Sequence, residues 1–396
     1  MQEKEKLRGK IAIIGIGEHP SGIFPEKTAA ELFYFAVKEA IKDAGISKDE
    51  IDAVIIEPCF ADRRFNTDLI WSRAVQELGL GGKCKTNVQV HSGGSTGSQS
   101  LRMALGLILS GQAETILIAH ADKLGSGLSA EEIRAIFSSV GIYEEWEAPY
   151  GLNYNAIGAL ITNRYMYETG TTIEEIASVI VSLRKWAALN PNALLRREVT
   201  IEEVLKSKMI AYPLTSRMCN IVCDGAHAYI VTSVKKAEKA KTPVYLLGMG
   251  GIVTHFSLMK ADITKFGWKK AGEEAFIQAG VKPEDVDIVE LYDSYPVMPL
   301  IQLEELGFCE RGKAGKFVYE GNTWPGGKLP MTTDGGSLAR GHHGAGCGIA
   351  HIVEAARQLM GKAGKRQVKN AKIAIATNIG GQYMDAQVMV FGREIS

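Results

Sequence analysis

The sequence predicts an α/β protein made of two copies of one design, with mixed sheets covered by helices. Two similar apolar runs end in glycines, at 11–17 and at 244–250. Each run is followed by the same series, in 37–57 and again in 272–292: an amphipathic helix, an Ala-Gly stop, an acidic turn and a strand. Strands that alternate with helices predict sheets with helices on both faces.

The first half contains further elements in a regular order. Gly45 ends the first helix as a residue that permits left-handed backbone, and the chain then turns into a strand. The remaining expected elements are a strand at 85–90, a glycine-rich loop at 91–97, a helix at 98–110 and a strand at 115–119.

The second half repeats this order. Gly280 follows Gly45 by 235 residues, and the offset is the same from Asp52 to Asp287, which indicates an internal duplication. The segment 329–333 leads to a second glycine-rich loop at 341–348, and the expected helix 349–360 and strand 371–377 follow it.

We expect two units of unequal length. The first half spans 1–240 and the second spans 241–396. The stretch from about 123 to 215 interrupts the alternation, because it is richer in aromatic and charged residues. It is interpreted as a mostly helical insertion, of the kind that commonly caps a functional site.

Composition excludes several classes of function. The 396 residues include 45 basic and 45 acidic side chains, so a sequence-independent nucleic-acid binder is not expected. The charged start does not resemble a signal peptide, and no apolar run approaches a membrane span, so we expect a cytoplasmic protein. Cys219 and Cys223 are four residues apart without a second pair, so we expect reduced thiols and no metal site.

The two glycine-rich loops are the candidate site. Each stands between a strand and a helix, where glycines let a ligand approach the backbone and the helix N-terminus favours negative charge. Because they occupy matching positions of the two halves, we expect them to face each other.

The order of motifs in the second half resembles that of the thiolase superfamily, in particular the sterol-carrier-protein-type thiolases. The motifs are 291–295, 303–309, 326–330, 334–336 and Gly341-His342, and Asp224-Gly225-Ala226 also suits this family. The resemblance covers essentially the whole chain. It implies the thiolase fold of duplicated αβαβα layered halves, with the helical insertion as a cap.

The departures from the family pattern concern the nucleophile. Gly94 stands where the resemblance implies a nucleophilic cysteine, and Asn378 stands at the other cysteine position. Where the family has a His-Asp-Cys-Phe element, this chain has Tyr292-Asp293-Ser294-Tyr295. Covalent acyl transfer by the usual route therefore lacks its nucleophile. Gly94 is also expected to leave room for a bulkier substituent.

The tyrosine and the missing cysteine resemble thiolase-like aldolases, which act on β-hydroxyacyl-CoA thioesters of steroid side chains. This implies retro-aldol cleavage with no covalent acyl-enzyme, with Tyr292 as acid/base and His342 as a helper that shares its proton or polarises the carbonyl. His342 itself is a departure, because that branch tends to have a tyrosine there. A thiolase-type acyltransferase with an altered site and a non-catalytic scaffold subunit remain as alternatives.

The expected site residues fall into two groups. Tyr292, His342 and Asp293 form the catalytic group, and Asp293 can equally hydrogen-bond the backbone and orient Tyr292. Residues expected to contact the substrate or its oxyanion are Gly94, Ser95, His91, His343, Gly380 and Gly381. Turn, capping and strand-end roles are the structural alternatives for Ser95 and His91, and a tight turn is the alternative for the glycine pair.

The resemblance also implies partners. Coenzyme A would enter only as part of the substrate, with no permanently bound cofactor. We expect a homodimer core formed near the first glycine-rich loop. We further expect a small zinc-ribbon/OB-fold protein of the DUF35 type, which would carry any zinc.

Overall fold

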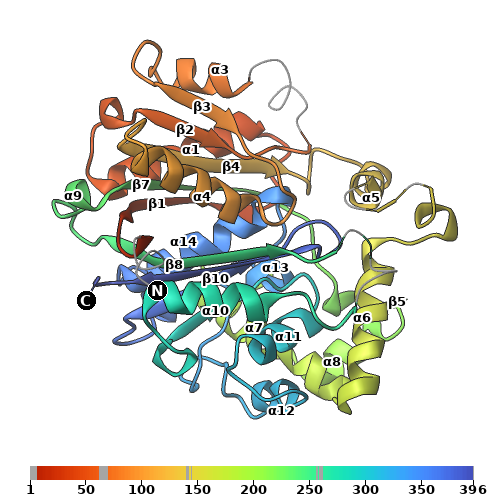
Figure 1. The fold of residues 1–396 in the computed structure, drawn as a ribbon. Helices are drawn as coiled ribbons and strands as arrows, with labels where there is room; N and C mark the ends of the chain where they lie inside the picture. The colour runs from red at the N-terminus through yellow and green to blue at the C-terminus, as the bar shows by residue number, and fades with distance from the viewer. Residues whose placement is uncertain are drawn as a thin grey trace.

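The computed structural model describes residues 7–61, 70–139, 142–143, 145–255, 257 and 262–395. Nine strands form one mixed sheet in the order β3-β2-β4-β7-β1-β8-β11-β10-β9 (Figure 1). The first half supplies β1 (Ile11–Gly22), β2 (Ala53–Ile56), β3 (Thr86–Gln89), β4 (Thr115–Lys123) and β7 (Asp224–Ser233). The second half supplies β8 (Val244–Val253), β9 (Ile288–Glu290), β10 (Ile373–Asn378) and β11 (Asp385–Gly392).

The strand order shows the duplication directly. Outward from the junction, the first half runs β1, β7, β4, β2 and the second runs β8, β11, β10, β9. The two expected sheets are joined by a short antiparallel contact, in which Ala12 pairs with Tyr245 and Ile13 with Val244. The counterpart of β3 is reduced to a single parallel bridge between Val289 and Met331, so the segment 329–333 forms no strand.

Helices cover both faces of each half. α1 (Ala29–Ala44) covers the first half and α10 (Trp268–Ala279) covers the second. α1 begins with a capping box between Thr28 and Glu31. The glycines expected to end these helices do so, with φ of 66° at Gly45 and 63° at Gly280.

Two helices form the central layer. α4 (Thr96–Leu109) and α14 (Cys347–Leu359) follow the two glycine-rich loops and pack against each other. Their contact is close, because a Cβ added at Gly97 would lie 2.6 Å from the nitrogen of Ile349. Along β1, Ile11 and Ile13 join the core around α4 and α14, while Ala12 joins the core under α1. The strands of the first half and those of the second half therefore lie on either side of α4 and α14, with α1 and α10 on the outer faces. This gives five layers: helix, sheet, helix, sheet, helix.

The stretch between β4 and β7 is mostly helical. It contains α5 (Ala130–Ser139), α6 (Tyr154–Thr169), α7 (Ile173–Leu189), α8 (Ile201–Leu205) and the small hairpin β5 (Met209–Ala211) and β6 (Leu214–Thr215). Figure 1 shows α6, α7 and α8 beside the second half, whereas α5 lies at the level of the strands of the first half. α7 packs on α12 (Ala314–Tyr319) and α13 (Gly336–Ala339), and α6 packs on α11 (Val297–Glu305). Two further short helices, α3 (Ile70–Glu77) and α9 (Val234–Ala237), complete the first half.

Candidate active site

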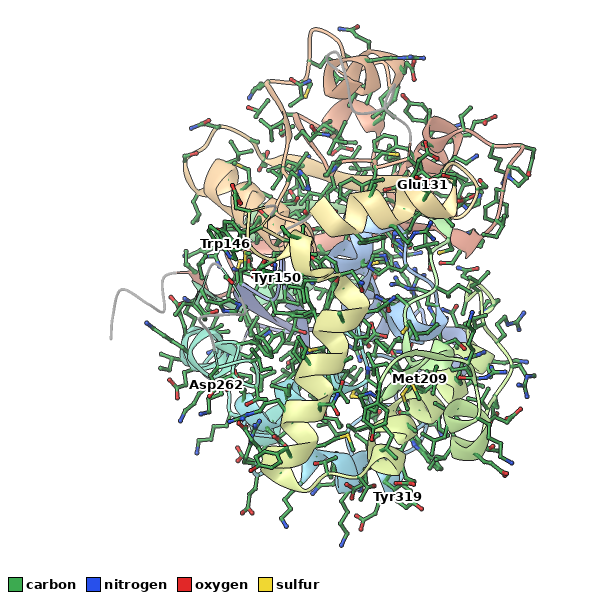
Figure 2. All side chains as sticks on the ribbon, turned by 90° about the vertical axis from the view of Figure 1, so that its right-hand side faces the viewer. Glu131, Trp146, Tyr150, Met209, Asp262 and Tyr319 are labelled. Atoms are coloured by element: carbon green, nitrogen blue, oxygen red, sulfur yellow. The ribbon has the colours of Figure 1, made fainter. Side chains whose placement is uncertain are left out.

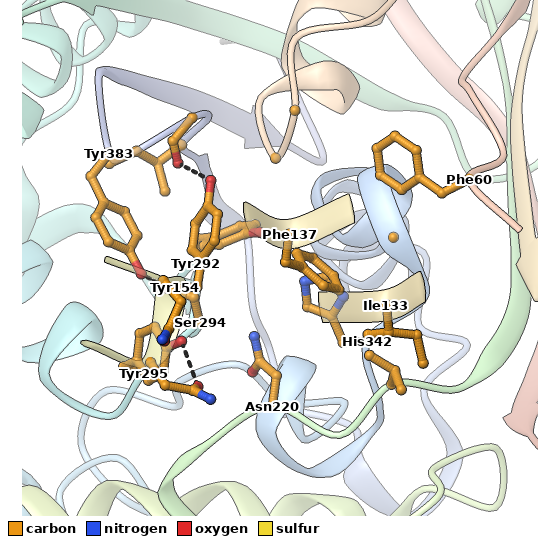
Figure 3. Close-up of a pocket in the computed structure, with 18 of the residues that line it drawn as sticks. Phe60, Ile133, Phe137, Tyr154, Asn220, Tyr292, Ser294, Tyr295, His342 and Tyr383 are labelled. Atoms are coloured by element: carbon orange, nitrogen blue, oxygen red, sulfur yellow. Dashed lines mark hydrogen bonds between the residues drawn. The ribbon is translucent and has the colours of Figure 1, made fainter. Parts of the chain in front are cut away.

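A cavity of about 360 Å³ lies between the two glycine-rich loops. Both halves and the insertion contribute to its wall, and Figure 3 shows the side chains that point into it. One side is formed by tyrosines, and the other by His342 with Phe60 and Ile133. The insertion closes the cavity with Ile133 and Phe137 from α5 and with the start of α6.

Gly94 and Tyr292 occupy the same corner of the cavity. A Cβ added at Gly94 would lie 2.7 Å from the hydroxyl oxygen of Tyr292 and 2.3 Å from the carbonyl oxygen of Ile379. Real Cβ atoms do not come so close to other atoms, so a side chain at position 94 would require both the Ile379 carbonyl and the phenol of Tyr292 to shift. The expectation that Gly94 leaves room for a bulkier substituent is therefore wrong, because the phenol fills that space.

The backbone around Tyr292 is held on both sides. Its amide donates to the hydroxyl oxygen of Thr377 at 2.9 Å, and its carbonyl accepts from the side-chain amide of Gln302 at 2.7 Å. Burial raises the pKa of Tyr292 well above 10, and the nearby Cys347 adds to the shift. The phenol is thus protonated at neutral pH and acts as a hydrogen-bond donor in the free protein.

His342 reaches the cavity from the second glycine-rich loop. Its amide donates to the carbonyl of Ile221 at 2.9 Å, and its carbonyl accepts from the amide of Cys223 at 3.0 Å. The ring meets Phe137 edge-on, with centroids 5.6 Å apart. Burial, with help from Arg340, lowers the pKa of His342 to about 4, so the imidazole is neutral at neutral pH and one ring nitrogen has a free lone pair.

The two expected catalytic side chains face the cavity from different sides. Figure 3 shows Tyr292 among the tyrosines and His342 across the cavity from them. No hydrogen bond joins them in the part of the chain that the structure describes. In this state Tyr292 and His342 therefore do not share a proton directly, and a substrate placed between them would contact both.

Asp293 does not line the cavity. Its carboxylate accepts the amides of Ser337 at 2.8 Å and Leu338 at 3.0 Å, at the beginning of α13. The side chain is fully buried, and burial raises its pKa to about 6. Asp293 therefore fixes the segment that carries Tyr292 to the start of α13, which is the structural alternative stated above.

A second carboxylate near the site, that of Asp385, holds two of the expected substrate contacts. Its Oδ1 accepts the hydroxyl of Ser95 at 2.7 Å and the amide of Gly380 at 2.6 Å. The Gly380 amide is therefore already used, and this corrects the expectation that it binds an oxyanion. Gly381 does line the cavity, where its carbonyl accepts the hydroxyl of Tyr154 at 2.7 Å.

Neither of the other two expected histidines is among the residues that line the cavity. His91 is exposed and contacts the ring of Phe60, which does line it. His343 is fully buried and points to His227 and His120, with ring centroids 4.7 and 5.6 Å away. His342 therefore lines the cavity, whereas His343 packs against two other histidines. Their shared residue type does not reveal this difference.

Several cavity residues were not expected from the sequence. Tyr295 donates to the side-chain oxygen of Asn155 at 3.0 Å, and Tyr383 and Ser294 share a hydrogen bond of 2.9 Å. The side-chain oxygen of Asn220 is buried and finds no partner among the described residues. Asn220 comes four residues before Asp224, and the motif there gave no signal for an amide in the site.

None of the six cysteines is among the residues that line the cavity. Cys347 begins α14 and lies near Tyr292, but it is fully buried. Burial raises its pKa to about 12, and that of Cys223 to about 12 as well. A thiolate nucleophile is therefore disfavoured at this site.

Membrane-spanning helices and metal centres are both missing from the described ranges. No helix there has the length and apolarity needed to cross a membrane. No group of three or more His, Cys, Asp or Glu side chains is arranged there to hold a metal ion.

Comparison with known proteins shows the family. Residues 250–393 match the family described as thiolase C-terminal domain-like. An acetyl-CoA acetyltransferase from Methanothermobacter thermautotrophicus is 32% identical over 97% of this chain and 99% of its own. A 17-hydroxy-3-oxo-4-pregnene-20-carboxyl-CoA lyase from Mycobacterium tuberculosis is 31% identical over 90% of this chain and 92% of its own.

The solved structures agree with these relatives. The structure of an Ltp2-ChsH2(DUF35) aldolase superimposes with a TM-score of 0.83 at 29% identity, and the match covers 98% of both chains. An acetyl-CoA acetyltransferase from Syntrophomonas wolfei has a TM-score of 0.73 at 18% identity, which shows the fold alone. The thiolase fold is thus confirmed, and the chain belongs to the thiolase superfamily, in the branch of the sterol-carrier-protein-type thiolases and thiolase-like aldolases.

Proposed function

We propose that this enzyme cleaves the bond between the α- and β-carbons of a β-hydroxyacyl-CoA thioester, or forms that bond in reverse, without a covalent acyl-enzyme. The observation that carries this proposal is the corner of the cavity at Gly94, where the Ile379 carbonyl and the Tyr292 phenol leave no room for a side chain. A nucleophile at position 94 would clash with both, and the phenol occupies this corner instead. A phenol donates protons and hydrogen bonds rather than accepting an acyl group at neutral pH.

The neutral imidazole of His342 acts as the general base. In cleavage it takes the proton of the β-hydroxyl, and the oxygen forms the new carbonyl as the bond between the two carbons breaks. The electron pair of that bond passes to the thioester as an enolate. The protonated Tyr292 stabilises the enolate and gives a proton to its carbon, which yields the shorter acyl-CoA. One proton leaves the hydroxyl and one enters the carbon, so the reaction balances.

The rest of the cavity supports binding of an acyl chain. Phe60, Ile133 and Phe137 give it an apolar side, and the open amide of Asn220 provides a polar contact. Pockets of this kind, largely apolar with a few placed polar groups, are typical of small-molecule sites. Coenzyme A enters as part of the substrate, and the mechanism needs no other cofactor.

The relatives support both this reaction and a second candidate. The lyase from Mycobacterium tuberculosis and a steroid side-chain-cleaving aldolase from Thermomonospora curvata are each 31% identical to this chain. The acetyl-CoA acetyltransferase at 32% identity favours thiolase-type acyl transfer instead. We prefer the lyase reaction because no cysteine lines the cavity within the described residues.

We also propose a homodimer core and a small DUF35-type partner. The partner proposal is supported by the aldolase of known structure, which is named together with a DUF35 component. It is also supported by the insertion, where Tyr150 is 88% exposed and Tyr212 is 73% exposed. Both line a groove together with Trp146, and Figure 2 shows Trp146 and Tyr150 on this face. Exposed apolar patches of this kind mark protein–protein contacts.

The test is incubation with a panel of β-hydroxyacyl-CoA and β-ketoacyl-CoA esters, with and without free CoA, followed by analysis of products and intact protein by mass spectrometry. Cleavage of a β-hydroxyacyl-CoA to a carbonyl compound and a shorter acyl-CoA, without CoA and without an adduct, is the expected result. CoA-dependent thiolysis or an acyl adduct would establish the acyltransferase instead. No reaction, with binding to a DUF35-type protein retained, would favour the scaffold.

A further inference from the structure

Three buried histidines lie between the active-site cavity and a second cavity. His343, next to His342 in the chain, stacks on His227 with centroids 4.7 Å apart. The Nε2 atom of His227 lies 3.6 Å from Oε1 of Glu18, and the side chains are 2% and 5% exposed. Glu18 and Arg357 line the second cavity, which has a volume of about 660 Å³. His120 completes the group, and we call His120, His227 and His343 the histidine row.

The histidine row has more buried ring nitrogens than the protein provides with hydrogen-bond partners. Both ring nitrogens of His343 and the Nδ1 atoms of His227 and His120 are buried, and they have no hydrogen-bond partner among the described residues. The same is true of Nδ1 of His342. Leaving a buried polar group unsatisfied costs about 1–3 kcal/mol, so a cluster of such groups points to a polar ligand between them.

The charges around the row indicate which ligand this is. The buried Arg340 lies 3.2 Å from Asp334, and Glu18 lies 2.8 Å from Arg357, so each ion has a counterion. An additional ion would be uncompensated there. Water is neutral, donates and accepts, and commonly bridges buried polar groups in proteins. Water molecules are therefore the ligand that fits.

The histidines have the protonation state that a proton pathway requires. Burial lowers the pKa of His120 to about 3, and it also lowers the pKa values of His227 and His343. A neutral imidazole donates through one nitrogen and accepts through the other, so it passes a proton on without holding a charge.

We propose that the histidine row, bridged by water, carries protons between His342 and the cavity at Glu18. This inference rests on the proposed function, in which His342 gains the hydroxyl proton and Tyr292 loses one to carbon. The row releases the proton from His342 while acyl product still fills the active-site cavity. Tyr292 regains a proton from water that enters as product leaves, so each turnover returns both groups to their starting state.

A high-resolution crystal structure of the full chain tests the ligand. Ordered waters within hydrogen-bond distance of the ring nitrogens of His343 and His227 are expected. Direct packing of these nitrogens against carbon, with no water between them, would overturn the proposal.

Comparison of the first turnover with later turnovers by rapid quench, with the best β-hydroxyacyl-CoA ester as substrate, tests the pathway. His342 is neutral at the start of the first turnover, but each later turnover requires it to release the proton that it took from the hydroxyl. We expect His227→Leu and His227→Gln to leave the first turnover at the wild-type rate and to slow later turnovers by about a hundredfold, the low end for loss of a proton-transfer group. Added imidazole should restore the later turnovers of His227→Leu. The matched control is His19→Gln, a buried histidine on β1, the strand that pairs with β7 of His227, whose ring nitrogens already contact Pro20 and Lys27.

The outcomes separate the two proposals. Later turnovers at the wild-type rate in both His227 variants would overturn the pathway and leave the proposed function standing. A loss that also occurs in His19→Gln, or that imidazole does not restore, would assign His227 a structural role instead. A wild-type protein that cleaves no β-hydroxyacyl-CoA ester would overturn the proposed function, and the pathway with it.

Discussion

At the scale of single residues, the function depends on the hydroxyl of Tyr292. Tyr292→Phe removes only that oxygen and keeps the ring that packs in the core. Loss of a general acid/base costs about two or more orders of magnitude in turnover, and we expect that reduction here. Steady-state cleavage of the best β-hydroxyacyl-CoA ester measures it, with a thermal melt as the control for folding. Turnover near that of the wild type would remove Tyr292 from the mechanism.

A double-mutant cycle should show that the free-energy cost of a side chain at position 94 depends on the hydroxyl of Tyr292. Gly94→Ala places a Cβ 2.7 Å from the phenol oxygen and 2.3 Å from the Ile379 carbonyl, and overpacking of this kind costs about 1–3 kcal/mol. Part of that strain disappears in Gly94→Ala with Tyr292→Phe, so the two changes should couple favourably in urea unfolding. Strictly additive losses would mean that the Ile379 contact alone requires glycine.

The sequence allowed some residues of the site to be predicted and not others. Tyr292 and His342 belong to motifs that identify their place, and both line the cavity. Gly380 and His343 stand in similar motifs, yet their roles depend on contacts with Asp385 and His227. A motif gives a position along the chain. It does not tell which partner, distant in sequence, already uses an amide or faces a ring.

At the scale of secondary structure elements, β2 ends beside a buried carboxyl group. Glu57 follows β2 and is fully buried, and its Oε1 accepts the hydroxyl of Ser100 from α4 at 3.3 Å. Burial raises the pKa of Glu57 to about 8. A raised pKa in the folded state favours the protonated form, so its contribution to stability is complete below the unfolded pKa near 4.5. That contribution is lost as the pH rises through about 8.

We therefore expect Glu57→Gln to flatten the dependence of stability on pH. Relative to the variant, the wild type should lose on the order of 1 kcal/mol of unfolding free energy per pH unit between about pH 5 and 8. Urea unfolding of both proteins at several pH values measures this difference. Parallel curves would mean that Glu57 is ionised in the folded protein at neutral pH.

The order of elements was more predictable than their extent. Helix ends at Gly45 and Gly280 were predicted correctly, because left-handed backbone at a helix terminus strongly favours glycine. The segment 329–333 stands where the first half has β3, but it forms one bridge at Met331 and no strand. Whether an extended segment joins a sheet depends on the neighbouring strand, which local sequence does not specify.

At the scale of the whole molecule, the insertion of the first half completes the second half. α7 lies between β4 and β7 in the chain, but Ile180, Leu183 and Ala187 belong to the same core as Leu300 and Leu338 of the second half. The second half alone would expose this apolar surface to water, in addition to the edge of β8 that pairs with β1.

The two halves should therefore not fold independently, although they repeat one design. We expect a fragment of residues 241–396 to lack a cooperative thermal transition and to aggregate, while the full chain unfolds its two halves together. Circular dichroism and calorimetry of both proteins test this. A fragment made of residues 1–240 is the matched control, and addition of this fragment should restore a cooperative transition if the α7 interface is what the second half lacks. Cooperative unfolding of 241–396 alone would show that the sheet and α14 suffice, and that α7 serves only to close the active site.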